Sequence, residues 1–123
     1  MLAACATTAA DRHEAPLAAA GDPARGREVF VSREGGHCVL CHAIPGVALA
    51  GDVGPSLAGV GSRLDSGQVR LRIMDLSRVK PEAAMPAFHR TEGLNRVAPN
   101  LAGKPVLPAQ QVEDLVAFLG TLR

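Results

Sequence analysis

The amino-acid sequence predicts an all-α domain, and three observations support that fold class. Three segments, which begin near residues 22, 65 and 108, repeat their apolar residues at helical spacing. No segment alternates apolar and polar residues as a half-buried strand does. Two loops rich in Gly and Pro, roughly residues 42–64 and 81–107, join the helical segments. Loops of this length in a compact domain usually surround something functional, so we expect the chain to fold around a ligand.

Local signals place the starts of the first two helices. Asp22 is a good N-cap, and Pro23 fits the first helical position that follows it. Asp65, followed three residues later by Gln68, resembles a capping box at the start of the second helix. Pro81 ends that helix at the latest, because proline lacks the amide that a helix interior needs.

The third helix has the clearest pattern. Pro108 opens it, and its apolar residues share one face. This face indicates the side of the helix that packs on the rest of the domain. Its residues are Val112, Leu115, Val116, Leu119 and Leu122.

The composition leaves the core short of large side chains. The 123 residues suffice for one domain, and 47% of them are apolar, but only 2% are aromatic: Phe30, Phe88 and Phe118. Aromatic rings usually supply much of the buried area in a small core, so we expect a non-protein group to fill part of it. The net charge of +1, without a basic run, does not suggest a nucleic acid or a membrane surface as partner.

The N-terminal segment, residues 1–20, is rich in alanine and is expected to be flexible, with the folded domain covering residues 21–123. It lacks the charged start and the long apolar stretch of a complete signal peptide. The run Leu2-Ala3-Ala4-Cys5 is similar to a bacterial lipobox, in which Cys5 would carry a lipid anchor. The alternatives are a partial export or lipoprotein leader and a floppy tail with an incidental cysteine. No stretch approaches the roughly 18 apolar residues of a membrane span.

The segment "HCVLCH" concentrates reactive side chains, because Cys38 and Cys41 are followed directly by His42. CxxCH is the attachment sequence for c-type haem: each thiol can add to one vinyl group of the porphyrin, and the histidine is then held under the iron. A structural zinc site needs four ligands, and only Cys5 remains as a further thiol. A thiol–disulfide switch would follow a strand, and no strand is predicted. We therefore expect one covalently bound haem c, with a zinc site and a thiol–disulfide switch as the alternatives.

The opposite side of the iron needs a second ligand, and four residues are candidates. His37 neighbours the attachment turn, and Met74 falls within the second helix, so neither is favoured. Met85 stands in a loop, and Pro86 fixes the backbone just beyond it. We expect Met85 to be the ligand, with His89 as the alternative. A Met–His ligand pair raises the reduction potential and leaves no open iron position, which favours electron transfer over oxygen chemistry.

Several short motifs together resemble the class I cytochromes c. They are Gly26 and Phe30 before the CxxCH motif, "GPSL" at 54–57, a Met-Pro loop and an apolar C-terminal helix. The resemblance implies a helical domain wrapped around one covalently bound haem c, in which the first and last helices cross at Gly26. It also implies that the backbone carbonyl of Pro55 accepts a hydrogen bond from the second nitrogen of His42.

A longer run, residues 72–122, resembles SoxX, the family of monohaem cytochromes that form one subunit of the SoxAX complex in thiosulfate-oxidising bacteria. The resemblance implies a periplasmic electron-transfer subunit paired with a SoxA-like cytochrome, dihaem or monohaem, which carries the catalytic cysteine. That complex joins thiosulfate to a cysteine of the SoxYZ carrier, and the SoxX-like subunit passes the released electrons to another cytochrome c. No catalytic residue is therefore expected in this chain. The alternative is a free-standing monohaem cytochrome c, or the haem subunit of another periplasmic dehydrogenase.

Three residues close to Met85, namely Phe88, His89 and Arg90, raise two alternatives. They could form a face that docks the partner subunit, or they could pack the loop against the haem.

Overall fold

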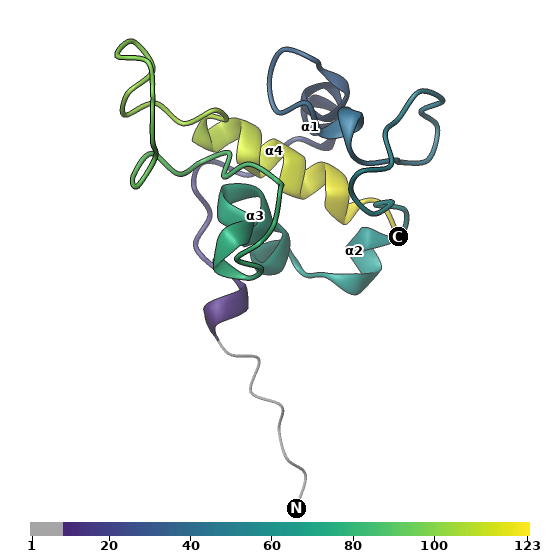
Figure 1. Ribbon diagram of the computed structural model, residues 1–123. Coiled ribbons are helices and arrows are strands. Elements are labelled where there is room, and N and C mark those ends of the chain that lie inside the picture. The colour runs from purple at the N-terminus through teal and green to yellow at the C-terminus, as the bar shows by residue number, and fades with distance from the viewer. Residues whose placement is uncertain (1–8) are drawn as a thin grey trace, which may run out of the picture.

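The computed structural model describes residues 9–123 and contains four α-helices and three short 3-10 turns in that range. No strand occurs among these residues, which confirms the all-α fold class. In Figure 1, α1 and α4 cross, α3 lies beside α4, and two long loops extend away from the helices. The helices are α1 (Pro23–Val31), α2 (Val60–Arg63), α3 (Ser66–Asp75) and α4 (Ala109–Gly120), and the turns are η1 (Ala9–Asp11), η2 (Cys38–Leu40) and η3 (Leu76–Arg78).

The crossing of α1 and α4 forms the centre of the fold, as the resemblance implied. Gly26 is buried there, and a Cβ atom on it would lie 2.7 Å from the Cβ of Phe118 and would also collide with the backbone carbonyl of Asp114. The missing side chain therefore lets the two helices approach each other. The rings of Phe30 and Phe118 pack at this crossing with their centroids 5.9 Å apart.

The capping signals predicted the helix starts well. Asp22 caps α1 through its side chain, and Asp65 and Gln68 make both hydrogen bonds of the capping box on α3. Pro108 occupies the N-cap of α4, and Leu122 lies just beyond the C-terminal end of this helix. The short elements α2 and η2 were not predicted, because one turn is too short to show a periodic pattern.

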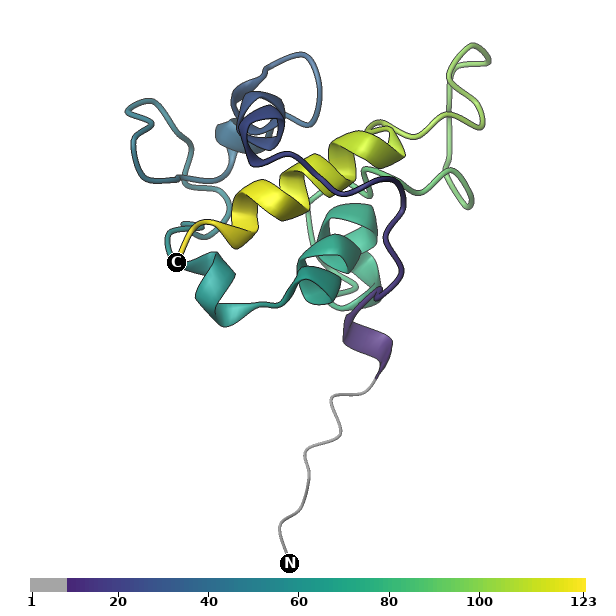
Figure 2. The ribbon, with the colours of Figure 1, turned by 180° about the vertical axis from the view of Figure 1, so that it is seen from behind.

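The N-terminal segment is held against the helices over the part that the structure describes. Residues 9–20 pass along α3 and α4 before they reach α1 (Figure 2). Arg70 of α3 donates to the carbonyl of His13 at 2.7 Å, and the amide of Leu17 donates to the carboxylate of Glu113 at 3.2 Å. Buried side chains of two helices therefore bind the backbone at His13 and Leu17, within the segment 1–20 that was expected to be flexible.

The sequence raised two questions about membranes: a lipid anchor at Cys5 and a membrane-spanning helix. Cys5, the candidate lipid attachment point, lies outside the described residues. Within residues 9–123, no helix has the length and apolar character needed to cross a membrane.

Candidate functional site

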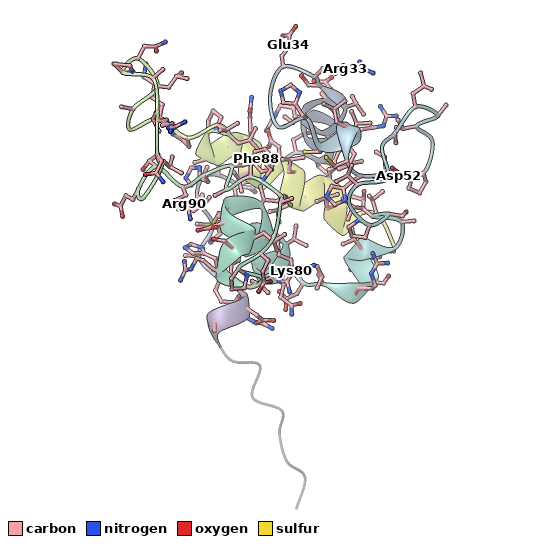
Figure 3. All side chains as sticks on the ribbon, viewed as in Figure 1. Arg33, Glu34, Asp52, Lys80, Phe88 and Arg90 are labelled. Atoms are coloured by element: carbon pink, nitrogen blue, oxygen red, sulfur yellow. The ribbon has the colours of Figure 1, made fainter. Side chains whose placement is uncertain are left out.

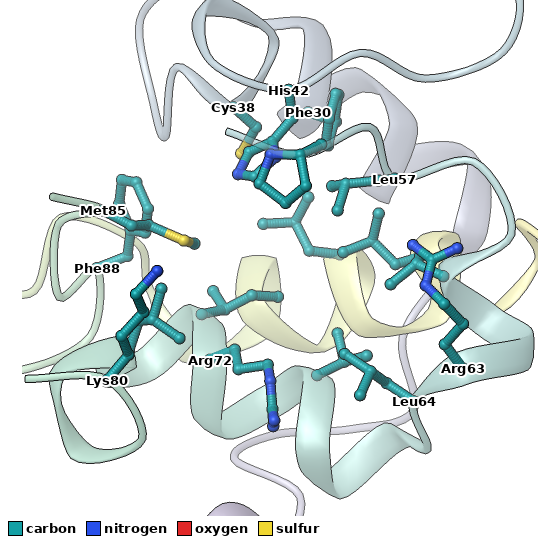
Figure 4. A pocket seen from close by; sticks show the side chains of 17 residues that line it. Phe30, Cys38, His42, Leu57, Arg63, Leu64, Arg72, Lys80, Met85 and Phe88 are labelled. Carbon is teal, nitrogen blue, oxygen red and sulfur yellow. The ribbon is translucent and has the colours of Figure 1, made fainter. Parts of the chain in front are cut away.

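A cavity of about 490 Å³ lies between η2, α2, α3, α4 and the loop that carries Met85. Its size is in the range of cofactor pockets, and most of its wall is apolar. Figure 4 shows Cys38 and His42 on one side of it and Met85 on another, with the Met85 sulfur directed into the cavity. The lining residues are Phe30, Cys38, His42, Pro55, Leu57, Val60, Arg63, Leu64, Val69, Arg72, Ile73, Leu76, Lys80, Met85, Phe88, Leu115 and Leu119.

A tight turn brings Cys38 and His42 to the same wall. His37 begins this turn in the left-handed conformation, with φ of 55°, and η2 follows it. The amides of Cys41 and His42 both donate to the carbonyl of Cys38, at 3.2 and 2.9 Å. Cys38 and His42 therefore line the cavity, whereas Cys41 is half-buried on the same turn and lies outside the lining.

The imidazole of His42 is oriented by the loop that follows it. Its Nδ1 lies 2.7 Å from the carbonyl oxygen of Pro55, and since a carbonyl only accepts, Nδ1 carries the proton. The hydrogen bond implied by the resemblance is present. Gly54 lies directly against the ring, because a Cβ atom there would be 2.7 Å from Nδ1. The arrangement leaves Nε2 as the nitrogen with a free lone pair for a metal.

The structure separates the four candidates for the second axial ligand. Met85 lines the cavity, whereas Met74 and His89 line a smaller pocket on another part of the surface. The Nδ1 of His89 also bonds the carbonyl of Leu107 at 2.9 Å. His37 is exposed and is absent from the cavity wall. Met85 is thus the one of the four that reaches the same cavity as His42.

The geometry does not favour the two alternatives to haem, a thiol–disulfide switch and a structural zinc site. Burial raises the pKa of the Cys38 thiol to about 11, and a reactive dithiol needs a lowered pKa instead. Across the described part of the chain, no three side chains among His, Cys, Asp and Glu come together as a metal site. A zinc-stabilised module would need such a cluster.

Sequence reasoning missed several residues that shape the site. Gly54 was visible only as the first letter of the "GPSL" motif, and its contact with His42 depends on the loop folding back. Arg63 and Lys80 line the cavity and bring positive charge to a mostly apolar wall. No local pattern marks them, because they come from α2 and from the loop after η3.

The structure places the residues of the expected docking face differently from one another. Phe88 is buried and lines the cavity, so it packs the loop inward. Arg90 forms an ion pair with Asp75 at 3.2 Å. Packing of the loop therefore describes Phe88, whereas Arg90 is exposed and docking of a partner there stays a prediction.

Comparison with known proteins agrees with this geometry. Residues 23–123 match the model of the cytochrome c family, and the chain belongs to that family. Within the family it is a SoxX-like electron-transfer cytochrome: it is similar to a chain in the crystal structure of SoxXA from P. pantotrophus, with a TM-score of 0.83 and 35% sequence identity. The alignment covers 92% of this chain and 90% of that chain. A search of the curated proteins finds no match.

The cofactor of this family is haem c, and the residues of the cavity fit it. Cys38 and Cys41 stand at thioether spacing on one turn, next to an apolar space of cofactor size. The cationic side chains of Arg63 and Lys80 at its wall suit a ligand that carries carboxylates (Figure 4). A haem in this cavity also explains why the protein has so few aromatic side chains, because the porphyrin would supply much of the core.

Proposed function

We propose that Cys38 and Cys41 would hold the haem through thioether bonds, and that His42 and Met85 would be the protein ligands of its iron. The single observation that supports this most strongly is the shared cavity: His42 presents Nε2 and Met85 presents its sulfur to one apolar space. When bound, haem c supplies a one-electron redox centre. The axial pair would hold both iron positions, so that no substrate binds the metal.

The chain's own residues prepare the site for electron transfer. Pro55 fixes the proton on Nδ1 of His42, which keeps the imidazole in one tautomer and one orientation. Apolar side chains of α3 and α4, such as Ile73 and Leu115, line the cavity and would keep water away from the bound haem. A dry, rigid surrounding reduces the rearrangement that accompanies a change in charge.

The physiological role that we propose is that of the SoxX-like subunit of a periplasmic complex with a SoxA-like cytochrome. In this role the chain accepts the electrons released when thiosulfate is joined to a cysteine of the SoxYZ carrier, and it passes them to another cytochrome c. The support is the structural similarity to a chain of SoxXA over nearly the full length of both chains. The catalytic cysteine would belong to the partner subunit.

Replacing the proposed ligand tests the site. In haem-loaded Met85→Leu, the reduction potential is expected to fall and added imidazole to bind the ferric iron, because the thioether is lost. Met74→Leu is a matched control, since Met74 lies outside the cavity. Unchanged potential and unchanged imidazole binding in Met85→Leu would remove Met85 as ligand, and His89→Ala would be examined next.

Affinity purification tests the role. The tagged holoprotein, isolated from thiosulfate-grown cells of the source organism, is expected to bring down a second haem-staining band of a SoxA-like cytochrome. A holoprotein that purifies alone and reduces a terminal oxidase unaided would instead indicate the free-standing carrier.

A further inference from the structure

The loop that carries Met85 leaves α3 and returns to it. It leaves through η3, and its returning end donates two backbone hydrogen bonds: Phe88 to the carbonyl of Ile73 at 3.3 Å, and His89 to the carbonyl of Met74 at 3.2 Å. These carbonyls belong to the last turn of α3, where intrahelical donors are missing. The end of the helix is therefore capped by the loop itself, and the loop is closed at its base.

One carboxylate, that of Asp75, binds both ends of this loop. Its Oδ1 accepts from the amide of Ser77 at 3.1 Å, on the outgoing side, and also from the Ser77 hydroxyl. Its Oδ2 accepts from Arg90 at 3.2 Å, on the returning side. The side chain of Asp75 is 11% exposed and that of Arg90 is 40% exposed. Figure 3 shows Arg90 beside α3, with Phe88 turned toward the centre of the molecule.

We propose that Asp75 and Arg90 are positioning residues that hold Met85 on the iron by closing the base of its loop. Neither side chain lines the haem cavity, so both act through Met85. The inference rests on the proposed role of Met85 as an axial ligand.

The physical reason is the coupling between loop closure and ligand exchange. An exogenous ligand reaches the iron only when the Met85 loop opens, so its apparent affinity is scaled by the fraction of open loop. Removing Arg90 leaves a mostly buried carboxylate without its charged partner, which favours rearrangement of the loop base. The backbone bonds from Phe88 and His89 remain, so we expect a looser loop and not an unfolded one.

The experiment measures imidazole binding to the ferric holoprotein by its visible spectrum. In Arg90→Gln, the affinity for imidazole is expected to rise about fivefold. This factor corresponds to the largest interaction free energy usually found for a partly exposed ion pair. Arg90→Lys keeps the charge and should return most of the wild-type behaviour. Arg78→Gln is the matched control, because Arg78 is an exposed residue of η3 that makes no hydrogen bond or ion pair to Asp75.

A second pair of variants separates positioning from a loss of stability. Asp75→Asn retains an acceptor for Ser77 but removes the charge that Arg90 binds, and we expect it to match Arg90→Gln. The double variant should then bind imidazole no more tightly than either single one, because the two side chains act as a unit. Thermal unfolding of each variant shows whether the fold is retained.

The imidazole measurements also separate two hypotheses: that Met85 is an iron ligand, and that Asp75 and Arg90 position it. If Met85→Leu opens the iron to imidazole but Arg90→Gln and Asp75→Asn bind it as the wild type does, Asp75 and Arg90 do not position the ligand. An equal rise in Arg78→Gln would lead to the same conclusion, since it would indicate a general effect of charge. If Met85→Leu itself changes nothing, the assignment of the ligand is wrong, and the inference falls with it.

Discussion

The imidazole of His42 is held from two directions, and both contacts come from adjacent residues of one loop. The backbone carbonyl of Pro55 accepts a hydrogen bond from Nδ1, while Gly54 allows the backbone to lie close to the ring. The backbone carbonyl of Pro55 cannot be removed by a side-chain substitution. Gly54 can be tested, because its role depends on the absence of a Cβ atom.

We expect Gly54→Ala to displace the imidazole of His42. The added Cβ atom would lie 2.7 Å from Nδ1, which is closer than non-bonded atoms approach. Overpacking of this kind costs about 1–3 kcal/mol of unfolding free energy. Denaturant unfolding of the holoprotein measures the loss, and its visible spectrum reports the iron ligands. Gly35→Ala is the control, since a Cβ atom there meets nothing closer than 3.8 Å. Equal stability of the two variants would contradict the close contact.

At the scale of secondary-structure elements, the pairing of α1 with α4 sets the shape of the molecule. The two helices lie far apart in the sequence and cross at Gly26. The core residues around the crossing include Phe30, Leu115 and Phe118. Because Phe30 and Leu115 also line the cavity, the crossing is one wall of the haem site.

Gly26→Ala is expected to push α1 and α4 apart. Its Cβ atom would meet the Asp114 carbonyl and the Phe118 side chain, and a helix backbone cannot yield as a flexible side chain can. We expect the unfolding free energy to fall by about 1–3 kcal/mol or more. Gly120→Ala, at the end of α4, has no atom within 4 Å and serves as the control. A Gly26→Ala variant as stable as that control would show that the helices are not in contact at this point.

The elements themselves could be predicted to different degrees. The starts of α1 and α3 follow from Asp22 and from the Asp65–Gln68 pair, since capping acts over three or four residues. The turn η2 and the helix α2 have no such signal, because contacts distant in sequence hold them in place. Gly61 of α2, for example, donates its amide to the carbonyl of Leu122 at 2.8 Å, beyond the end of α4.

At the scale of the whole molecule, a buried ion pair joins three parts of the chain. Arg70 of α3 and Glu113 of α4 lie 2.8 Å apart, and each side chain is 5% exposed. The same two side chains bind the backbone of the N-terminal segment at His13 and Leu17. The pair therefore connects α3, α4 and the segment before α1.

Glu113→Gln is expected to destabilise the protein strongly. The change leaves the Arg70 guanidinium buried without its counter-charge, and breaking a buried pair in this way costs about 3–5 kcal/mol. Denaturant unfolding measures the change. Glu28→Gln is the matched control, because Glu28 is exposed on α1. A loss as small as that of the control would show that the ion pair contributes little.

Acid should unfold the protein through two of its buried carboxylates. Burial opposes ionisation of Glu113 and Asp114, but hydrogen bonds outweigh it and hold the pKa of each below its usual value. The donors are Arg70 and the Leu17 amide for Glu113, and Arg25 and the Asp22 amide for Asp114.

The lowered pKa values determine how the unfolding free energy changes with pH. The stabilisation is complete above the unfolded-state pKa values of about 4 and is lost as the pH falls through the folded-state values. Unfolding free energies measured from neutral pH down to about pH 3 should therefore decrease below roughly pH 5. The decrease should be smaller in Glu113→Gln. A stability independent of pH over that range would contradict the ion-pair assignment.

The sequence by itself determined the helical fold class, two helix starts and the CxxCH motif that predicts haem attachment at Cys38, Cys41 and His42. All of these depend on residues within a few positions of one another, so local patterns are sufficient. Which of Met85, His89, Met74 and His37 lines the cavity of His42 depends on loops that fold back, and so do the contacts of Gly54 and Asp75. Only the tertiary structure decided these points, because residues distant in sequence make the contacts on which they rest.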